Sequence, residues 1–208
     1  LFPYTTLFRS KALLKVNNNI SRDYFIWERF RQGDKNALSE IYKSHYTSLL
    51  DYGLRIRRDR EFIQECIQEL FFYLISNIKS LGPIYNLRAY LLASLRRKIF
   101  NEIRNREKMQ PTETNLVPQF DFELSQEEIM VDQESSRKRK SELKKILNKL
   151  PAREKEAVYL KFYKDMSYEE ITSVMGISYD SARKFVYRAI KNLREMSHSK
   201  VMDFLKPM

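Results

Sequence analysis

The chain is poor in the residues that interrupt helices. Its 208 residues include only four glycines and six prolines, and we find no stretch with the alternating pattern of a strand. Apolar positions instead recur at steps of three and four residues along most of the chain, as in amphipathic helices. The sequence therefore predicts an all-α fold.

Cysteine and long apolar runs are also scarce. The single cysteine, Cys66, cannot form an internal disulfide and is expected to be a reduced thiol in a helical core, which favours a cytoplasmic protein. No run of about 18 apolar residues is present to span a bilayer, and the start of the chain lacks the features of a signal peptide. Residues 1–10 begin without Met and share no pattern with the residues after them, so we expect residues 1–21 to be a non-native or disordered leader.

Groups that catalyse reactions or bind metals are sparse. The two histidines, His45 and His198, lie far apart, and the chain has neither a glycine-rich phosphate loop nor a Cys/His ligand cluster. The carboxylates form no recognisable metal set. We expect no enzymatic activity, no metal, no cofactor and no small-molecule substrate; the enzyme alternative, a nuclease or a nucleotide-dependent activity, has little support in these residues.

Charge is distributed unevenly along the chain. The net charge of +11 indicates a polyanionic partner, with a solvated basic surface as the plain alternative. Residues 112–136 hold seven Asp and Glu and no Lys or Arg. We therefore predict two helical domains, residues 22–108 and 141–196, joined by an acidic linker at 109–140 and followed by a tail at 197–208.

The C-terminal domain carries the pattern of a helix-turn-helix. Ser167 and Glu170 form the capping box of one helix, and Gly176 is suited to end it in a left-handed conformation. Ser178 then caps a second helix with a buried apolar stripe, and two helices joined by a short glycine-containing turn are typical of duplex DNA binding.

The outer face of the second helix is strongly basic. We expect its N-terminal residues to reach base edges and its later residues to meet phosphates. Lys155, Lys161 and Lys164 are expected to add phosphate contacts, and a merely solvated basic face is the alternative. The predicted duplex-binding residues are Tyr179, Asp180, Ser181, Arg183, Lys184, Tyr187, Arg188 and Lys191.

The N-terminal domain is predicted to contain helices near residues 23–31, 36–57, 59–78 and 86–106. An apolar stripe in the third helix is expected to be core, with Gln64, Glu65, Gln68 and Glu69 on the opposite, polar face. The fourth helix combines cations and rings that can bind single-stranded DNA by phosphate neutralisation and base stacking. Core aromatics beside solvated arginines would give the same pattern, so both interpretations stay open.

Four segments in order resemble bacterial sigma factors of the sigma-70 family, specifically the extracytoplasmic-function group. These are Phe30–Asp34 with Ala37, Ile41, Tyr42 and Tyr46; Asp59–Phe71; Leu87–Leu92; and Leu150–Arg194. The resemblance covers about Arg22 to Glu195.

The resemblance implies core RNA polymerase and promoter DNA as partners, with transcription initiation as the function. It implies that Asp59, Gln64, Glu65, Gln68 and Glu69 bind the polymerase and that the C-terminal module reads the minus-thirty-five element. It also makes a membrane-bound anti-sigma partner plausible. The residues it implies for recognising and melting the minus-ten element are Arg88, Tyr90, Arg96, Arg97, Phe100, Asn101 and Arg104.

One alternative function uses the same C-terminal module. A helix-turn-helix regulator would bind duplex DNA without core polymerase and would carry an unrelated N-terminal sensor domain. The 59–78 segment and the acidic linker count against this alternative.

Overall fold

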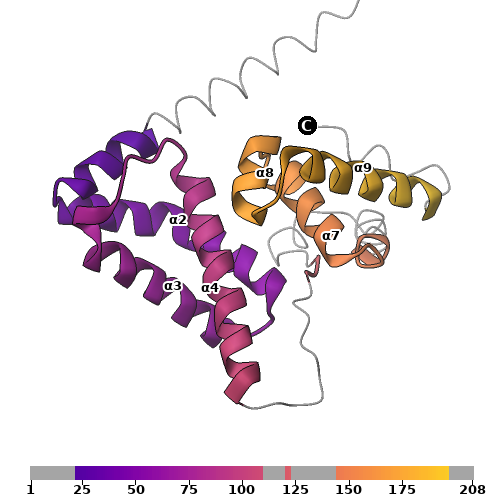
Figure 1. Ribbon diagram of the computed structural model, residues 1–208, viewed down its shortest axis with the longest axis horizontal. Coiled ribbons are helices and arrows are strands. Elements are labelled where there is room, and N and C mark those ends of the chain that lie inside the picture. Colours follow the sequence, from indigo (N-terminus) through magenta and orange to yellow (C-terminus); the bar gives the residue numbers. More distant parts are fainter. Residues whose placement is uncertain (1–21, 110–119, 123–143, 197–208) are drawn as a thin grey trace, which may run out of the picture.

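A computed structural model describes residues 22–109, 120–122 and 144–196 of the chain. Within these ranges nearly every residue outside short connections is helical and no strand occurs, which confirms the predicted all-α fold. The helices form an N-terminal group and a C-terminal group that lie side by side (Figure 1). None of the described helices is both long and apolar enough to cross a membrane.

The N-terminal group consists of a helical segment at 22–31 followed by three longer helices. These are α2 (Lys35–Ile56), α3 (Arg60–Ser76) and α4 (Leu87–Met109), with a 3-10 turn, η1 (Ile78–Ser80), after α3. The predicted helices are confirmed in number and order. Their predicted ends lie within three residues of the observed ones, because caps and turn residues mark the ends only approximately.

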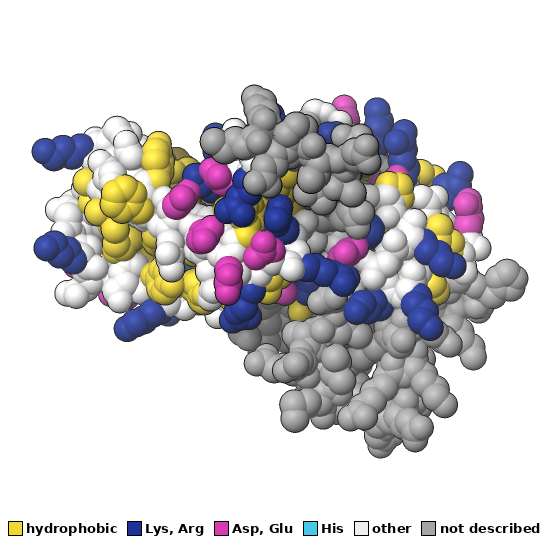
Figure 2. Space-filling model, turned by 90° about the horizontal axis from the view of Figure 1, so that it is seen from below, with side chains coloured by type: hydrophobic (Ala, Val, Ile, Leu, Met, Phe, Trp, Pro, Cys, Tyr) yellow, Lys and Arg dark blue, Asp and Glu magenta, His cyan; other side chains and the backbone are white. Residues whose placement is uncertain are grey.

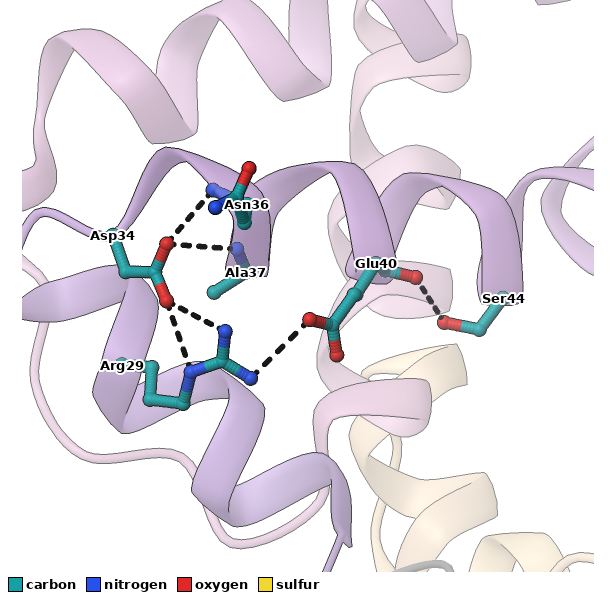
Figure 3. Close-up of polar contacts among 6 residues, drawn as sticks. All are labelled: Arg29, Asp34, Asn36, Ala37, Glu40 and Ser44. Carbon is teal, nitrogen blue, oxygen red and sulfur yellow. Dashed lines mark hydrogen bonds and ion pairs between the residues drawn. The ribbon is translucent and has the colours of Figure 1, made fainter.

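The start of α2 shows how a polar residue directs a helix (Figure 3). Asp34 accepts hydrogen bonds from the backbone amides of Asn36 and Ala37, at 2.8 and 3.4 Å. Amides at a helix start have no partner within the helix, so this cap stabilises the first turn. Arg29 donates to the other oxygen of Asp34 at 2.6 and 2.9 Å and also contacts Glu40 at 3.2 Å, which fixes the preceding helical segment against α2.

The N-terminal core lies where α2, α3 and α4 face one another. The apolar stripe predicted for the third helix is buried on α3, and Ile78, which follows in η1, is partly buried. Its buried members are Ile63, Cys66, Ile67, Leu70, Phe71 and Leu74. On α4 the inward residues are Leu87, Leu91, Leu95, Ile99 and Ile103, all of them buried. Tyr90 on the same helix is partly buried and packs on Trp27 at 5.7 Å between ring centroids. Trp27 is fully buried and donates its indole N–H to the Gly82 carbonyl at 3.0 Å, which joins the first helix to the α3–α4 connection.

The C-terminal group begins with a short helical segment at 144–147. It continues with α7 (Ala152–Val158), a π-turn η2 (Tyr159–Tyr163), α8 (Tyr168–Met175) and α9 (Tyr179–Met196). The capping box is present: Ser167 Oγ accepts from the Glu170 amide at 3.2 Å, and Glu170 accepts from the Ser167 amide at 2.6 Å. Gly176 has φ of 64°, and Ser178 Oγ accepts from the Ser181 amide at 3.2 Å. The predicted helix-turn-helix is therefore confirmed.

The two groups share a continuous hydrophobic core. Residues from α2, α3 and α4 and residues from η2, α8 and α9 belong to one buried cluster, and α8 lies between α4 and α9 (Figure 1). Phe120, within the predicted linker, is 3% exposed and lies 6.1 Å from the Tyr52 ring and 5.3 Å from the Tyr159 ring. The domain boundaries remain predictions, but part of the segment between the domains belongs to this shared core.

Candidate nucleic-acid interface

Helix α9 presents a basic face to solvent. Ala182, Val186, Ala189 and Leu193 anchor its inner side in the core. Seven of the eight predicted duplex-binding residues are exposed, and Ser181 is partly buried beside the Ser178 cap. The exposed residues are Tyr179, Asp180, Arg183, Lys184, Tyr187, Arg188 and Lys191. A helix anchored on one side and basic on the other can be inserted into the major groove.

A groove lies beside this basic face, between α8 and α9. It encloses about 400 Å³ and is lined by Tyr168, Asp180, Arg183, Lys184, Val186, Tyr187 and Ile190. The Arg183 guanidinium carbon is 6.0 Å from the centre of the Tyr179 ring. Cations and rings therefore lie together at the N-terminal end of α9, where base contacts are expected.

The three lysines that were expected to contact phosphates each contact another group of the protein. Lys155 is 7% exposed and contacts Asp121 at 3.5 Å. Lys164 contacts Asp51 at 3.0 Å, and Lys161 donates to the Met166 carbonyl at 3.0 Å. These ammonium groups therefore have partners inside the protein, and their contacts with phosphates stay a prediction.

The residues proposed for the minus-ten element lie along α4 but differ in access. Arg97, Asn101 and Arg104 are exposed, and Arg104 donates to Asn101 at 2.6 Å. The other four are partly buried: Arg88, Tyr90, Arg96 and Phe100. The structure therefore brings the seven residues onto one helix without leaving all of them open.

Arg96 forms the most buried ion pair between the two helical groups. Its guanidinium donates to both carboxylate oxygens of Glu156 on α7, at 2.8 and 3.2 Å, and Tyr52 on α2 also donates to Glu156. Burial disfavours ionisation of Tyr52, and the charge of Glu156 adds to this, so the pKa of the phenol lies well above its usual value. Burial lowers the pKa of Arg96, but the hydrogen bond and charge of Glu156 raise it more, so Arg96 stays charged.

A second polar cluster joins α2 to η2. Asp51 accepts from Tyr159 Oη at 2.6 Å and from Lys164 Nζ at 3.0 Å. Burial acts to raise the pKa of the Asp51 carboxyl, but these hydrogen bonds and the charge of Arg55 lower it below its usual value. The Arg55 guanidinium lies 4.5 Å from the centre of the Tyr159 ring, so the aromatic face also stabilises this cation.

The predicted polymerase-binding row follows the outer face of α3. Gln64 donates to Tyr46 Oη at 3.0 Å, Glu65 pairs with Arg106 at 3.2 Å, and Glu69 pairs with Lys98. Asp59 caps α3 by accepting from the Phe62 amide at 3.1 Å. Gln68 is exposed, so the row is polar, solvent-facing and partly held in place by neighbours.

The sequence analysis did not predict that large apolar side chains are exposed further along the outer face of α3. Phe72, Tyr73 and Ile75 on α3 are 70%, 53% and 51% exposed. Figure 2 shows hydrophobic side chains gathered over the N-terminal part of the molecule. The run Phe71-Phe72-Tyr73 was an available signal, because one face of a helix cannot bury three consecutive residues. An exposed apolar patch beside polar residues is typical of a protein-binding surface.

Aromatic residues are also exposed near the connection that precedes α4. Tyr85 is 72% exposed and stacks on Tyr24 at 5.7 Å between ring centroids. Phe25, beside Tyr24, is 66% exposed. No three His, Cys, Asp or Glu side chains are grouped to hold a metal ion within the part of the chain that the structure describes.

Comparisons with known proteins agree with this geometry. The family described as Sigma-70 region 2 matches residues 41–109, and the family described as Sigma-70, region 4 matches residues 140–193. The chain is 23% identical over 165 residues to RNA polymerase sigma factor YlaC of Bacillus subtilis (strain 168), covering 77% of this chain and 92% of that protein.

Two solved structures have a similar fold. CnrH, solved in complex with the cytosolic domain of CnrY, aligns with a TM-score of 0.57 and 16% identity over 84% of this chain and 96% of that one. The sigma factor RpoE from Bartonella quintana, solved with the anti-sigma factor NepR, aligns with a TM-score of 0.57 and 19% identity over 76% of this chain and 94% of that one. The two family matches together span more than half of the chain.

Proposed function

Because the chain belongs to the sigma-70 family of RNA polymerase sigma factors, in its extracytoplasmic-function group, we propose a role for each of its three exposed functional faces. As a sigma factor, the protein binds core RNA polymerase and directs it to promoters. The proposal assigns the minus-thirty-five element to α9, the minus-ten element to α4 and the polymerase to α3.

The exposed basic face of α9 carries the minus-thirty-five assignment. This helix is the second of a helix-turn-helix with both caps in place, and Ala182, Val186, Ala189 and Leu193 on its inner side are buried. Arg183 and Lys184 lie near the N-terminal end of α9, which enters the groove first in this motif. Arg188 and Lys191 lie further along and would neutralise phosphates.

The minus-ten assignment depends on the exposed edge of α4. Arg97, Asn101 and Arg104 are open to solvent and can meet a DNA strand directly. Arg88 and Arg96 would join them only after leaving their partners in the C-terminal group. Tyr90 and Phe100, which are partly exposed, would add base stacking.

The polymerase assignment combines a polar row with an apolar patch. Gln68 and Glu69 would give hydrogen bonds and charge complementarity, while Phe72 and Ile75 would supply buried area at the contact. Interfaces commonly place apolar anchors within a polar rim. This pairing of features on one helix supports a protein partner for α3.

The solved relatives suggest a further partner and setting. CnrH was solved with the cytosolic domain of CnrY, and RpoE with the anti-sigma factor NepR. By analogy we propose that an anti-sigma factor holds this protein inactive. Since the partner of CnrH is described by its cytosolic domain, we propose that this anti-sigma factor is membrane-bound. We further propose that it acts in the cytoplasm, catalyses no reaction and needs no cofactor or small-molecule substrate.

Transcription in vitro tests the proposal. Core RNA polymerase with the purified protein and a promoter library should yield specific transcripts that the core enzyme by itself does not make. The double variant Gln68→Ala/Glu69→Ala should weaken core binding, whereas Glu40→Gln, which removes a carboxylate charge elsewhere on the same domain, should not. Tight duplex binding without any core binding would instead support the helix-turn-helix regulator.

A further inference from the structure

An acidic side chain lies among the cations at the N-terminal end of α9. Asp180, the second residue of this helix, is exposed and lines the groove between α8 and α9 together with Arg183 and Lys184. At about 100° per residue, Asp180 lies within about 40° of Lys184 and Lys191 around the helix axis. Ala189, on the opposite side of the helix, is buried in the core. The carboxylate therefore points away from the core and toward the molecule that the basic face binds.

Contacts within the protein do not account for this carboxylate. In the described parts of the chain its oxygens form no hydrogen bond or ion pair, and Ser178 supplies the cap of α9 by accepting from the Ser181 amide at 3.2 Å. The helix dipole favours a negative charge in the first turn. That preference does not require the charge to lie on the side of the helix that carries the cations.

The neighbouring Arg183 is directed by a ring. Its guanidinium carbon lies 6.0 Å from the centre of the Tyr179 ring, close enough for a cation–π contact. The Tyr179 ring in turn packs edge-on against Tyr168 of α8, with 5.8 Å between centroids. Arg183 and Asp180 therefore project from the same turn of α9 as two separate groups of opposite charge.

A carboxylate in this place would discriminate among DNA bases. Phosphates repel it, so Asp180 can add affinity only where the major groove offers a hydrogen-bond donor. Those donors are the amino groups N4 of cytosine and N6 of adenine. Adenine also presents the acceptor N7 beside its amino group, to which a carboxylate has no proton to give, and the edges of guanine and thymine present acceptors. Cytosine is therefore the base that a carboxylate fits best.

We propose that Asp180 selects a cytosine in the minus-thirty-five element, next to a guanine that Arg183 selects. The guanidinium fork of arginine matches O6 and N7 of guanine. Three residues advance by about 4.5 Å along a helix axis, and base pairs are spaced by about 3.4 Å, so the two side chains can reach neighbouring base pairs. This inference rests on the proposed assignment of α9 to duplex DNA.

The variant Asp180→Asn tests the base assignment because it keeps the shape of the side chain and changes its hydrogen-bond chemistry. An amide has both a donor and an acceptor, so it pairs with N7 and N6 of adenine. The full-length protein, mixed with core RNA polymerase, would select duplexes from a library that is randomised in the minus-thirty-five region. We expect the wild type to enrich cytosine at one position, Asp180→Asn to enrich adenine at that position, and both to enrich guanine beside it.

Binding to two duplexes that differ only at this position measures the size of the effect. The wild type should bind the cytosine duplex about tenfold more tightly than the adenine duplex, within the range for one good base contact. Asp180→Asn should reverse this order. Tighter binding to the adenine duplex cannot arise from misfolding, since a damaged protein would lose affinity for both.

The control variant is Asp165→Asn, which removes the same charge from the connection before α8. Asp165 is exposed and has φ of 48°, a left-handed conformation that asparagine tolerates. Its loss of charge should change the affinity for both duplexes by the same factor. The sequence selected from the library should stay that of the wild type.

The possible outcomes separate this inference from the proposed function. Selection of the same sequence by the wild type and Asp180→Asn would overturn the base assignment, even if both proteins start transcription with core polymerase. Loss of the guanine preference without a change at the cytosine position would also overturn it, because Asp180 would then only position Arg183. An exchange of cytosine for adenine without any transcription would support the base assignment and overturn the proposed function.

Discussion

The two basic helices, α4 and α9, differ in how much of their cationic surface the fold leaves open. On α9 every predicted DNA-binding cation is exposed. On α4 two of the four predicted arginines contact the C-terminal group, and one of them lies in an ion pair whose carboxylate side chain is 5% exposed. Helices of similar composition thus present two different surfaces: the cations of α9 are open to solvent, whereas two arginines of α4 are paired with groups of the protein itself.

The largest expected effect is a difference in stability between variants of two adjacent arginines on α4. Arg96→Ala leaves Glu156 buried without its cation and should lower the free energy of unfolding by about 3 kcal/mol, the scale for breaking a buried pair. Arg97→Ala removes an exposed cation and should change stability by less than about 0.5 kcal/mol. Urea denaturation of both variants measures the difference. Equal losses would mean that the ion pair is no more important for stability than a surface charge.

A smaller effect is expected from the base-reading end of α9. Arg183→Ala should weaken binding to the preferred duplex by about 2 kcal/mol and relax sequence preference. Lys191→Ala should weaken binding to all sequences alike and reduce its dependence on salt. Competition binding with specific and scrambled duplexes distinguishes the two. A uniform loss for Arg183→Ala would exclude it from base reading.

The smallest expected effect concerns the turn that positions α9. Gly176 has φ of 64°, and a Cβ there would meet nothing within 4 Å. Gly176→Ala should therefore cost only the backbone strain, about 1 kcal/mol in thermal or chemical unfolding. Gly82→Ala also meets open space but requires no left-handed backbone, so it should have little effect. Equal destabilisation by both substitutions would contradict the role of the left-handed turn.

Much of the fold can be derived from patterns within a few residues. The capping box at Ser167 and Glu170, the end of α8 at Gly176 and the buried stripe of α9 were all predictable from spacing. The basic outer face of α9 was predictable for the same reason, and these residues are exposed within the part of the chain that the structure describes. The roles of these residues in DNA binding remain predictions.

The sequence did not show how far other charged and aromatic side chains are exposed to solvent. Lysine is usually found at the surface, yet Lys155 pairs with Asp121 and Lys164 pairs with Asp51, both from distant parts of the chain. Phe120 lies in a segment that the sequence predicts to be a polar linker, but its side chain is buried in the core that the two groups share. Periodicity shows which side of a helix faces inward, but it does not show what covers the other side.

Local sequence was enough to specify the helices, their caps, the helix-turn-helix and the family, because each depends on short spacings and local hydrogen bonds. The pairing of two α4 arginines with groups of the C-terminal domain is visible only in the packed molecule. The Tyr52–Glu156 contact joins residues 104 positions apart, and the Arg96–Glu156 contact joins residues 60 apart. A chain with many charges of both signs permits many such pairs, and only the packing of α7 and α8 against α2 and α4 selects among them.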